Sequence, residues 1–264
     1  LEALLLALAA AFLHAGWNVL LRGSTDVAAR TIAVLVVSVV LFAPAAAATW
    51  RVQAAAIPYV AASAALEAVY FVLLTAAYRR RELSVVYPVA RGSAPALVLA
   101  GTAVVLGRAV SGAQVAGVLL VAAGVVLVRG LRSGADGIGV GLAIGALIAG
   151  YTLVDKEGLH HAAPIPYLEL VLAPIALVAI AVRPRALREQ ASLATLGAAA
   201  GSFGAYLLFL FALRLTAAPG VAAVRETSVV IGAILAALFL KERVTWTRLL
   251  GAAIVAAGVA VLAA

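Results

Sequence analysis

Ten apolar stretches follow one another along almost the whole chain, and they constrain the fold more than any other feature of the sequence. They lie at about residues 2–21, 30–49, 57–78, 83–106, 111–128, 136–155, 164–182, 191–213, 216–240 and 245–263. Each is close to the ~20 residues that an α-helix needs to cross a bilayer. The connecting segments are short, and 66% of the 264 residues are hydrophobic whereas 11% are charged. We therefore predict an all-α polytopic membrane protein with ten transmembrane helices and no soluble domain.

The chain also aligns with itself, without a gap, when it is shifted by 134 residues. Arg91 then falls on Arg225, and the pentapeptide VAAGV at 121–125 recurs at 255–259. Each repeat holds five apolar stretches, an odd number, so the second repeat must enter the membrane in the opposite orientation. We predict two inverted-topology five-helix repeats, residues 1–130 and 135–264, an arrangement typical of secondary transporters.

The formal net charge of +8 comes from Lys and Arg in short clusters between the apolar stretches. Such clusters are typical of membrane anchors, and the absence of a basic face excludes nucleic acid as a partner. Loops after odd-numbered stretches hold 13 of the 19 basic residues and loops after even-numbered stretches hold 4. The positive-inside rule therefore places the odd loops in the cytoplasm and both termini outside.

One permanently charged side chain, Arg91, lies inside the fourth apolar stretch, in VVYPVARGSAP. Proline removes a backbone donor and clashes with the preceding turn, so Pro88 and Pro95, which flank Gly92, predict a kink or an interruption of the helix. Opened backbone and a charge at membrane depth both need contact with protein or with a water-filled cavity. We therefore predict that this segment lines a cavity.

The second repeat carries the same feature in APGVAAVRETS, where Pro219 and Gly220 precede Arg225. Two interrupted helices at equivalent places in the two halves of a transporter indicate its binding site. We predict that Arg91 and Arg225 bind the substrate. The alternative, which stays open, is that each arginine only pairs with a buried carboxylate.

Three glutamates inside apolar stretches, Glu67, Glu169 and Glu226, are candidates for proton coupling or gating, and His14 is a fourth. A carboxyl group at membrane depth changes its protonation as its surroundings switch between wet and dry. A plain ion pair with an arginine is an equally good interpretation of each glutamate.

His14, Trp17 and Asn18 share one face of the first stretch, because residues three and four apart are neighbours on a helix. They predict either a pocket wall or polar contacts between packed helices. The full set of predicted substrate-binding residues is Arg91, Arg225, Tyr87, Trp17, Asn18, Tyr70, Tyr151 and Tyr206.

Glycines predict where helices pack closely. Gly117 and Gly124, with their repeat equivalents Gly251 and Gly258, put small residues on one stripe of the fifth and tenth stretches. The two stripes contact either each other or a second protomer, which would make a homodimer. Gly137, Gly141 and Gly145 predict close packing of the sixth stretch.

No motif for catalysis, a metal or a cofactor is recognisable, so we expect no enzyme activity. The absence of Cys excludes disulfides and thiolate metal sites, and His160 and His161 lack further ligands nearby. Asp155 and Lys156 close the sixth stretch and are predicted to lie at the membrane interface. The first stretch lacks a basic n-region, so we treat it as a permanent helix.

Three segments resemble the EamA-type ten-helix branch of the drug/metabolite transporter superfamily. They are FLHAGWNVLLRGS (12–24), YRRRELSVVYPVARGSAP (78–95) and RETSVVIGAILAALFLKERVTWTRLLGAAIVAAGV (225–259). The last includes KER, where this family commonly has Gly-Glu-Arg, whereas LGRAVSG at 106–112 in the first half has no acid. The resemblance covers essentially the whole chain.

This resemblance implies that the first four helices of each repeat surround a central cavity and the fifth packs outside. It implies export or exchange of small metabolites by alternating access, and termini in the cytoplasm, which conflicts with the charge count.

We therefore predict a secondary transporter of a small polar or amphipathic metabolite, such as an amino acid or another carboxylate-bearing solute, in a bacterial inner membrane. The alternative is a proton-coupled exporter of organic cations that uses the intramembrane glutamates. A non-transporting scaffold or an embedded enzyme is a third interpretation.

Overall fold

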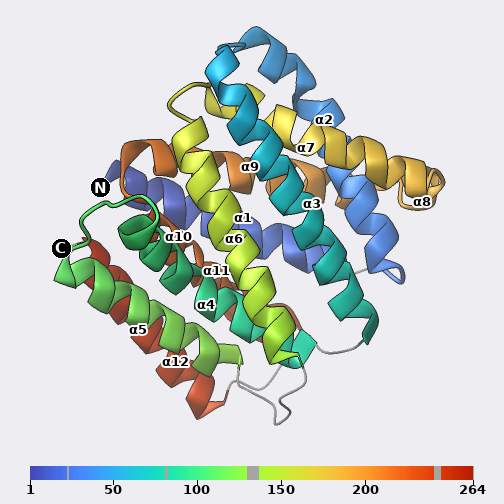
Figure 1. The fold of residues 1–264 in the computed structure, drawn as a ribbon. Coiled ribbons are helices and arrows are strands. Elements are labelled where there is room, and N and C mark those ends of the chain that lie inside the picture. The colour runs from blue at the N-terminus through green and yellow to red at the C-terminus, as the bar shows by residue number, and fades with distance from the viewer. Residues whose placement is uncertain (23, 81–82, 130–136, 241–244, 264) are drawn as a thin grey trace.

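The computed structural model describes residues 1–22, 24–80, 83–129, 137–240 and 245–263, and its regular structure there is helical (Figure 1). The helices are α1 (Glu2–Arg22), α2 (Val27–Ala48), η1 (Ala54–Ala56), α3 (Ile57–Arg80), α4 (Leu83–Val104), α5 (Gly112–Arg129), α6 (Ile138–Gly158), α7 (Pro164–Val182), α8 (Ala186–Glu189), α9 (Leu193–Leu215), α10 (Ala218–Arg225), α11 (Thr227–Leu240) and α12 (Trp246–Ala263). Val52 and Ala162 form an isolated antiparallel β-bridge. The all-α fold class is therefore confirmed for the described residues.

Eight segments of the described chain are long and apolar enough to cross a membrane. They are Glu2–Leu21, Val27–Ala48, Ala54–Ala77, Ile138–Gly158, Pro164–Val182, Leu193–Leu215, Ala218–Leu235 and Trp246–Ala263. The apolar helix Gly112–Val128 is shorter, and α4 is not among the eight. The chain is an integral membrane protein.

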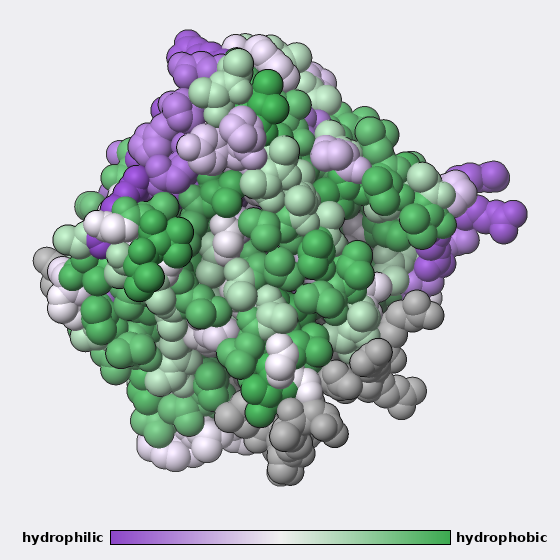
Figure 2. All heavy atoms as spheres, in the orientation of Figure 1, coloured by the Kyte–Doolittle hydropathy of each residue, from purple (hydrophilic) through white to green (hydrophobic). Residues whose placement is uncertain are grey.

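The surface supports this conclusion. Figure 2 shows a broad apolar area in the middle of the molecule, with hydrophilic residues gathered at the upper left and at the right. Large apolar side chains such as Val72, Leu177 and Val182 are exposed. Exposed apolar surface of this extent is stable only against lipid or a partner.

Of the kink or interruption predicted for the fourth apolar stretch, the interruption is wrong. Helix α4 runs without a break through Pro88, Gly92 and Pro95. Pro44 in α2 and Pro174 in α7 also lie inside continuous helices. Neighbouring helices and small backbone adjustments make proline tolerable inside membrane helices, so a proline pair alone does not predict a break.

The ninth apolar stretch is interrupted, but not at the residues that suggested it. Pro219 and Gly220 lie in the first turn of α10, where proline costs nothing because the first helical N–H groups have no partner within the helix. The break lies at Glu226, between the end of α10 at Arg225 and the start of α11 at Thr227.

Helices α5 and α12 pack against each other along one edge of the bundle (Figure 1). A Cβ added to Gly124 would lie 2.7 Å from the carbonyl oxygen of Gly251, and a Cβ added to Gly258 would lie 2.8 Å from that of Gly117. Only glycine allows such a close approach of two backbones. Of the two alternatives for the glycine stripes, the structure therefore shows contact between the stripes within one chain.

The glycines of α6 also serve packing, as predicted. A Cβ on Gly141 would lie 3.0 Å from the carbonyl oxygen of Val86, and one on Gly145 would lie 3.1 Å from that of Ala90, so α6 lies close against α4. Gly137 caps α6 with a φ of 98°, a conformation that favours glycine.

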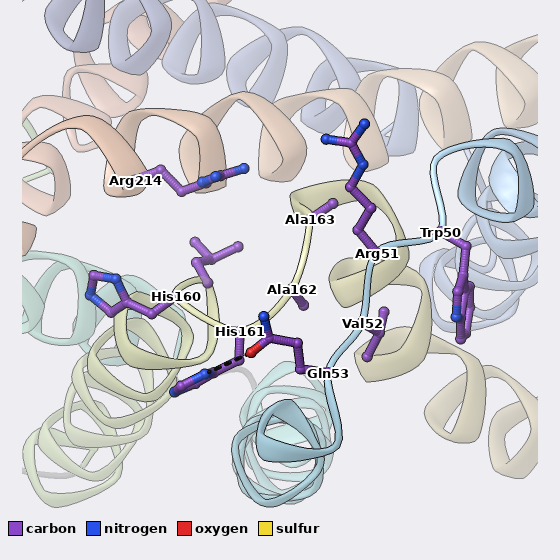
Figure 3. A pocket seen from close by; sticks show the side chains of 10 residues that line it. Trp50, Arg51, Val52, Gln53, His160, His161, Ala162, Ala163 and Arg214 are labelled. Atoms are coloured by element: carbon purple, nitrogen blue, oxygen red, sulfur yellow. Dashed lines mark hydrogen bonds between the residues drawn. The ribbon is translucent and has the colours of Figure 1, made fainter.

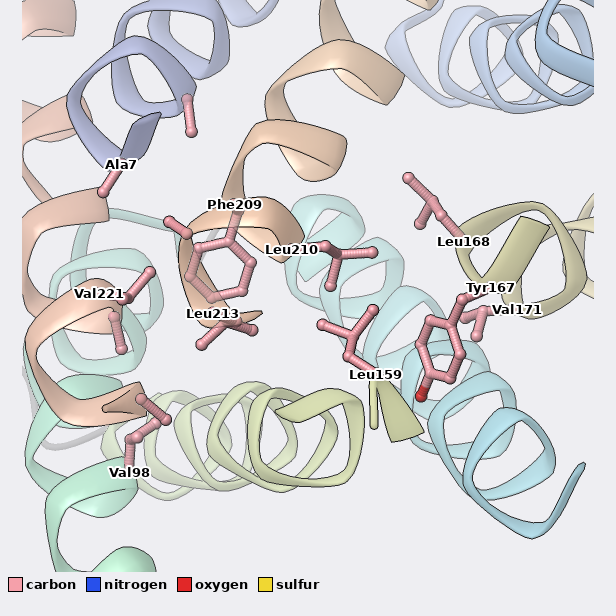
Figure 4. Close-up of a cluster of buried hydrophobic side chains, with 14 of the residues drawn as sticks. Ala7, Val98, Leu159, Tyr167, Leu168, Val171, Phe209, Leu210, Leu213 and Val221 are labelled. Carbon is pink, nitrogen blue, oxygen red and sulfur yellow. The ribbon is translucent and has the colours of Figure 1, made fainter. Parts of the chain in front are cut away.

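Helix α10 occupies the centre of the bundle, where it contacts α1, α4, α5, α6, α9 and α12. Seven of its eight residues are buried. Figure 4 shows part of the core around it, with Phe209 of α9 near Val221 of α10, and Leu210 of α9 on the side of Tyr167 and Leu168 of α7. The interrupted segment is thus enclosed by helices from both halves of the chain.

Candidate functional site

Arg91 lies inside the bundle, where it meets groups from three segments. Its Nη1 atom is 3.2 Å from Oε1 of Glu226, at the break between α10 and α11. Its Nη2 atom is 2.8 Å from Nε2 of His14 on α1, and its guanidinium lies 5.4 Å from the ring centroid of Tyr87. The side chain is 7% exposed. Arg91 therefore connects α4 to α1 and to the central break.

The contact with Arg91 also defines the state of His14. A guanidinium donates hydrogen bonds and accepts none. The Nε2 atom of His14 must therefore be the acceptor, which makes His14 neutral in this arrangement, with its proton on Nδ1.

Arg225 has the equivalent position in the second half but different neighbours. It is the last residue of α10, and its guanidinium lies 4.4 Å from the ring centroid of Phe209 and 5.3 Å from that of Tyr206. It is 8% exposed. Among the residues that the structure describes, no carboxylate comes within ion-pair distance of Arg225.

Glu67 forms no ion pair with an arginine whose side chain the structure describes. Its Oε1 atom lies 2.5 Å from the hydroxyl oxygen of Tyr206 on α9, and the same hydroxyl lies 2.7 Å from Oδ2 of Asp155 on α6. The other oxygen of Asp155 accepts hydrogen bonds from Ser63, at 2.6 Å, and from Tyr167, at 3.0 Å. Carboxyl groups from two helices, α3 and α6, thus meet at one tyrosine on a third helix, α9.

Asp155 and Lys156, which were predicted to lie at the membrane interface, are both buried inside the protein. Asp155 is 1% exposed, and Nζ of the buried Lys156 donates to the backbone oxygens of Leu213, at 2.5 Å, and Thr216, at 3.1 Å. Asp155 follows Tyr151 by four residues and so shares its helix face, which is the signal that sequence analysis overlooked.

Four aromatic side chains, which include Tyr206, form a row inside the bundle. Ring centroids are 6.1 Å apart for Tyr70 and Tyr151, 6.2 Å for Tyr151 and Tyr206, and 6.1 Å for Tyr206 and Phe209. Three predicted tyrosines, Tyr70, Tyr151 and Tyr206, therefore come together with Arg225, and Phe209 joins them without having been predicted.

The remaining candidates lie less centrally. Trp17 packs edge-to-face on His14 with centroids 5.4 Å apart, and Asn18 donates to the backbone oxygen of His14 on its own helix at 2.7 Å. Glu169 on α7 is buried, but no described contact joins it to Arg91 or Arg225. The structure therefore separates Glu169 from the other predicted site residues.

A cavity of about 440 Å³ opens at the end of the bundle where α2 and α6 finish (Figure 3). Its walls include two arginines and two histidines, Arg51, Arg214, His160 and His161. Backbone hydrogen bonds from Gln53 to His161, at 3.0 Å, and from Ala163 to Arg51, at 2.8 Å, tie the two connecting segments together. The described residues bring no three His, Asp or Glu side chains together as a metal site would need.

Comparisons with known proteins agree with this architecture. The model of the EamA-like transporter family matches residues 136–264. A solved structure described as "Crystal structure of protein" superposes with a TM-score of 0.80 at 16% sequence identity, and the match covers 98% of this chain and 95% of that chain. That likeness concerns the fold alone. The comparison with curated proteins gives no match.

Proposed function

The chain belongs to the EamA-like transporters of the drug/metabolite transporter superfamily, and we propose that it is a secondary transporter of small carboxylate-bearing metabolites such as amino acids. In this proposal Arg225 binds the substrate carboxylate, and Arg91 organises the site around it. The transporter works by alternating access as an exporter or exchanger in a bacterial inner membrane.

The helix packing supports two inverted five-helix repeats, residues 1–130 and 135–264. If each of α1–α5 is matched with α6, α7, α9, α10–α11 and α12, most of the contacts between the halves have a counterpart. Contact of α1 with α9 corresponds to that of α3 with α6, and contact of α2 with α9 corresponds to that of α3 with α7. Helix pairs α2–α7 and α5–α12 correspond to themselves. Such exchange of partners is expected of a pseudo-two-fold axis.

The surroundings of Arg225 carry the assignment of the substrate. A buried cation is costly unless an anion or a polar group compensates it. Arg91 has Glu226 for this purpose, whereas Arg225 has only the faces of two aromatic rings among the described residues. A substrate carboxylate would supply the missing anion, and the planar guanidinium binds carboxylates through two parallel hydrogen bonds.

The neighbouring side chains suit the rest of such a substrate. Tyr70, Tyr151, Tyr206 and Phe209 provide an apolar aromatic wall with hydroxyl groups at intervals. Trp17 adds an indole N–H that is buried without an acceptor in the described part of the chain. Pockets for small polar ligands combine apolar walls with a few such polar groups.

Transport by the purified protein in proteoliposomes tests this proposal. We expect uptake of a tritiated mixture of common amino acids but not of the tritiated cation tetraphenylphosphonium. Arg225→Gln should reduce amino-acid flux about tenfold or more, because hydrogen bonds to charged groups contribute about 1.5–3 kcal/mol. The exposed Arg188 on α8 provides the matched control, Arg188→Gln, which should transport normally.

Two outcomes would contradict the proposal. Flux of the cation but not of amino acids would favour the rival organic-cation exporter. Unchanged amino-acid flux in Arg225→Gln would remove Arg225 from the binding site.

A further inference from the structure

One tyrosine hydroxyl bridges two buried carboxyl groups from opposite halves of the chain. The Tyr206 oxygen lies 2.5 Å from Glu67 and 2.7 Å from Asp155. Oxygen atoms at these separations must share a hydrogen. Glu67 and Asp155 are 3% and 1% exposed, and the short separations leave no room for a water between the oxygens.

Counting hydrogens fixes the charge of this group. A tyrosine hydroxyl has one hydrogen to donate, so it can satisfy one carboxylate only. If both acids were ionised, the second contact would bring two oxygens together with no hydrogen between them. One carboxyl group must therefore carry a proton that it donates to the Tyr206 oxygen.

The hydrogen bonds also indicate which acid carries that proton. Asp155 receives hydrogen bonds from Ser63 and Tyr167 on one oxygen and from Tyr206 on the other. Several donors stabilise the ionised form of a carboxyl group. Asp155 is therefore the carboxylate, and Glu67 donates its proton to Tyr206.

Among the described titratable and charged groups that surround Glu67 and Asp155, one cation has no carboxylate partner of its own. Tyrosine and serine hydroxyls keep their protons near neutral pH. The facing groups are Ser63 and Tyr70 on α3, Tyr151 on α6, Tyr167 on α7 and Arg225 on α10, with Arg91 on α4, His14 on α1 and Glu226 beyond them. Glu226 matches the charge of Arg91 and His14 is neutral, so Arg225 is the nearest cation to the single negative charge that Glu67 and Asp155 share, although it forms no ion pair with either acid among the described contacts.

Arg225 and the two acids contact the same side chain, that of Tyr206. The guanidinium of Arg225 is 5.3 Å from the centroid of the Tyr206 ring, and the hydroxyl of that ring contacts both acids. A zwitterion with one carbon between its carboxylate and its ammonium carries the two opposite charges that such a cation and such acids would bind.

We propose that Glu67 and Asp155 hold one exchangeable proton through Tyr206, and that the ammonium of a zwitterionic substrate displaces this proton while its carboxylate binds Arg225. The proton leaves Glu67 for water, and the ammonium replaces that single positive charge beside the two acids, so the summed charge of the acids and their bound cation stays at minus one. The inference rests on the proposed function for the role of Arg225. It specifies the substrate as a zwitterion and makes the transporter a proton antiporter.

The fold supplies a reason why exchange accompanies conformational change. Glu67 belongs to the first half of the chain, whereas Asp155 and Tyr206 belong to the second. Separating the helices that carry them breaks the bridge and exposes the acids. Asp155 lies one helical turn from Leu159, which lines the open cavity of Figure 3, so the route to water from that end is short.

Proton release on binding is the direct test. The purified protein in a weakly buffered detergent solution with a pH-sensitive dye is mixed with the neutral L-amino acids. We expect close to one proton released per bound amino acid, and an apparent Kd that rises up to about tenfold per unit fall in pH, the limit for competition with one proton.

Two controls test whether proton release depends on the ammonium of the substrate and on Glu67. The corresponding α-keto acids keep the carboxylate but lack the ammonium, so they should release no proton. Glu67→Gln keeps a donor to Tyr206 and so preserves the bridge, but it should abolish both proton release and the pH dependence of binding.

An infrared measurement keeps the proton site testable without any substrate. The carbonyl stretch of a protonated carboxyl group should be present in the wild type, lost in Glu67→Gln and retained in Glu169→Gln. Persistence of the band in Glu67→Gln would overturn the shared proton.

The outcomes separate this inference from the proposed function. Amino acids that bind or move without releasing a proton, at an affinity independent of pH, would overturn the inference and leave the proposed function standing. Failure of both amino acids and α-keto acids to bind would overturn the substrate assignment on which both rest, and the infrared band would then decide on the proton site alone.

Discussion

Arg91 and Arg225 occupy equivalent positions in two halves of one chain, yet their surroundings differ. Arg91 forms an ion pair with Glu226 and a hydrogen bond with His14. Arg225 lies on the rings of Phe209 and Tyr206, without an ion pair in the described part of the chain. The charge of Arg91 is therefore compensated by a neighbouring carboxylate, whereas Arg225 remains available to bind an anion.

The difference originates in single residues that only one half contains. Glu226 follows Arg225, whereas glycine follows Arg91, and the acid reaches across to the arginine of the other half. Glu67 corresponds to Gly201, and Asp155 corresponds to Leu21. The repeat therefore builds a symmetric scaffold, and unmatched acids make the centre asymmetric. An asymmetric centre can hold a substrate in one orientation.

The largest effect is expected from removing the acid that distinguishes the two arginines. Glu226→Gln leaves Arg91 buried without its counterion, and breaking a buried ion pair by removing one partner costs about 3–5 kcal/mol. We expect a large fall in the apparent midpoint of thermal unfolding, measured by loss of the monodisperse peak in size-exclusion chromatography after heating.

Two further variants sharpen this result. Arg91→Met combined with Glu226→Gln removes both charges and should recover most of the lost stability. Glu189→Gln on α8, where the side chain is 43% exposed, should change the midpoint little. Equal destabilisation by the single and the double variant would show that Glu226 acts through something other than Arg91.

A smaller effect is expected where the two halves are alike. Gly124→Ala and Gly258→Ala are equivalent changes, and each would bring a Cβ within 2.7–2.8 Å of a backbone oxygen on the facing helix. Overpacking of this kind costs about 1–3 kcal/mol. Both variants should lower the unfolding midpoint by a similar amount, in contrast to the unequal arginines.

Gly139 supplies the matched control, because no described atom lies within 4 Å of a Cβ placed there. Gly139→Ala should leave the midpoint unchanged or raise it slightly. If Gly124→Ala were tolerated as well as Gly139→Ala, the close approach of α5 and α12 would be wrong.

These comparisons also show what the sequence could predict. Apolar length and the repeat anticipated the helices within a few residues, because crossing a bilayer imposes both length and composition. The repeat identified Arg91 and Arg225 as equivalent buried charges. It could not predict that Glu226 pairs with Arg91 instead of its neighbour Arg225, because that choice depends on how the halves face each other.

Predictions from local sequence failed at positions where contacts with other helices determine the structure. Pro88 and Pro95 are strong helix breakers in isolation, yet α4 is continuous because the surrounding helices enclose it. Asp155 was assigned to the interface from its place at the end of an apolar stretch, but Ser63, Tyr167 and Tyr206 satisfy it inside the bundle. Three partners from three helices leave no pattern along the chain.

The smallest loss of stability is expected from the exposed ion pair of Asp26 and Arg183, which can be compared with the buried ion pair of Arg91 and Glu226. Asp26 lies outside the membrane spans, where it caps α2 by accepting from the backbone N–H of Ala29 at 2.9 Å and pairs with Arg183 at 2.7 Å. The hydrogen bond from the backbone N–H of Ala29, and then the hydrogen bond from the Arg183 side chain, lower the pKa of Asp26 below its usual value. A lowered pKa in the folded state means that this carboxylate stabilises the protein above its ordinary pKa of about 4, and that the contribution fades as the pH falls through the folded value.

Asp26→Ala should therefore lower the unfolding midpoint at neutral pH by the equivalent of about 1 kcal/mol, the usual contribution of a helix N-cap. Asp26→Asn should cost less, because asparagine also caps helices, and it isolates the exposed ion pair, for which surface pairs contribute about 0–1 kcal/mol. The gap between wild type and Asp26→Asn should close as the pH is lowered through 4 and as salt is raised. If Asp26→Asn were as damaging as Glu226→Gln, burial would not be what separates these two ion pairs.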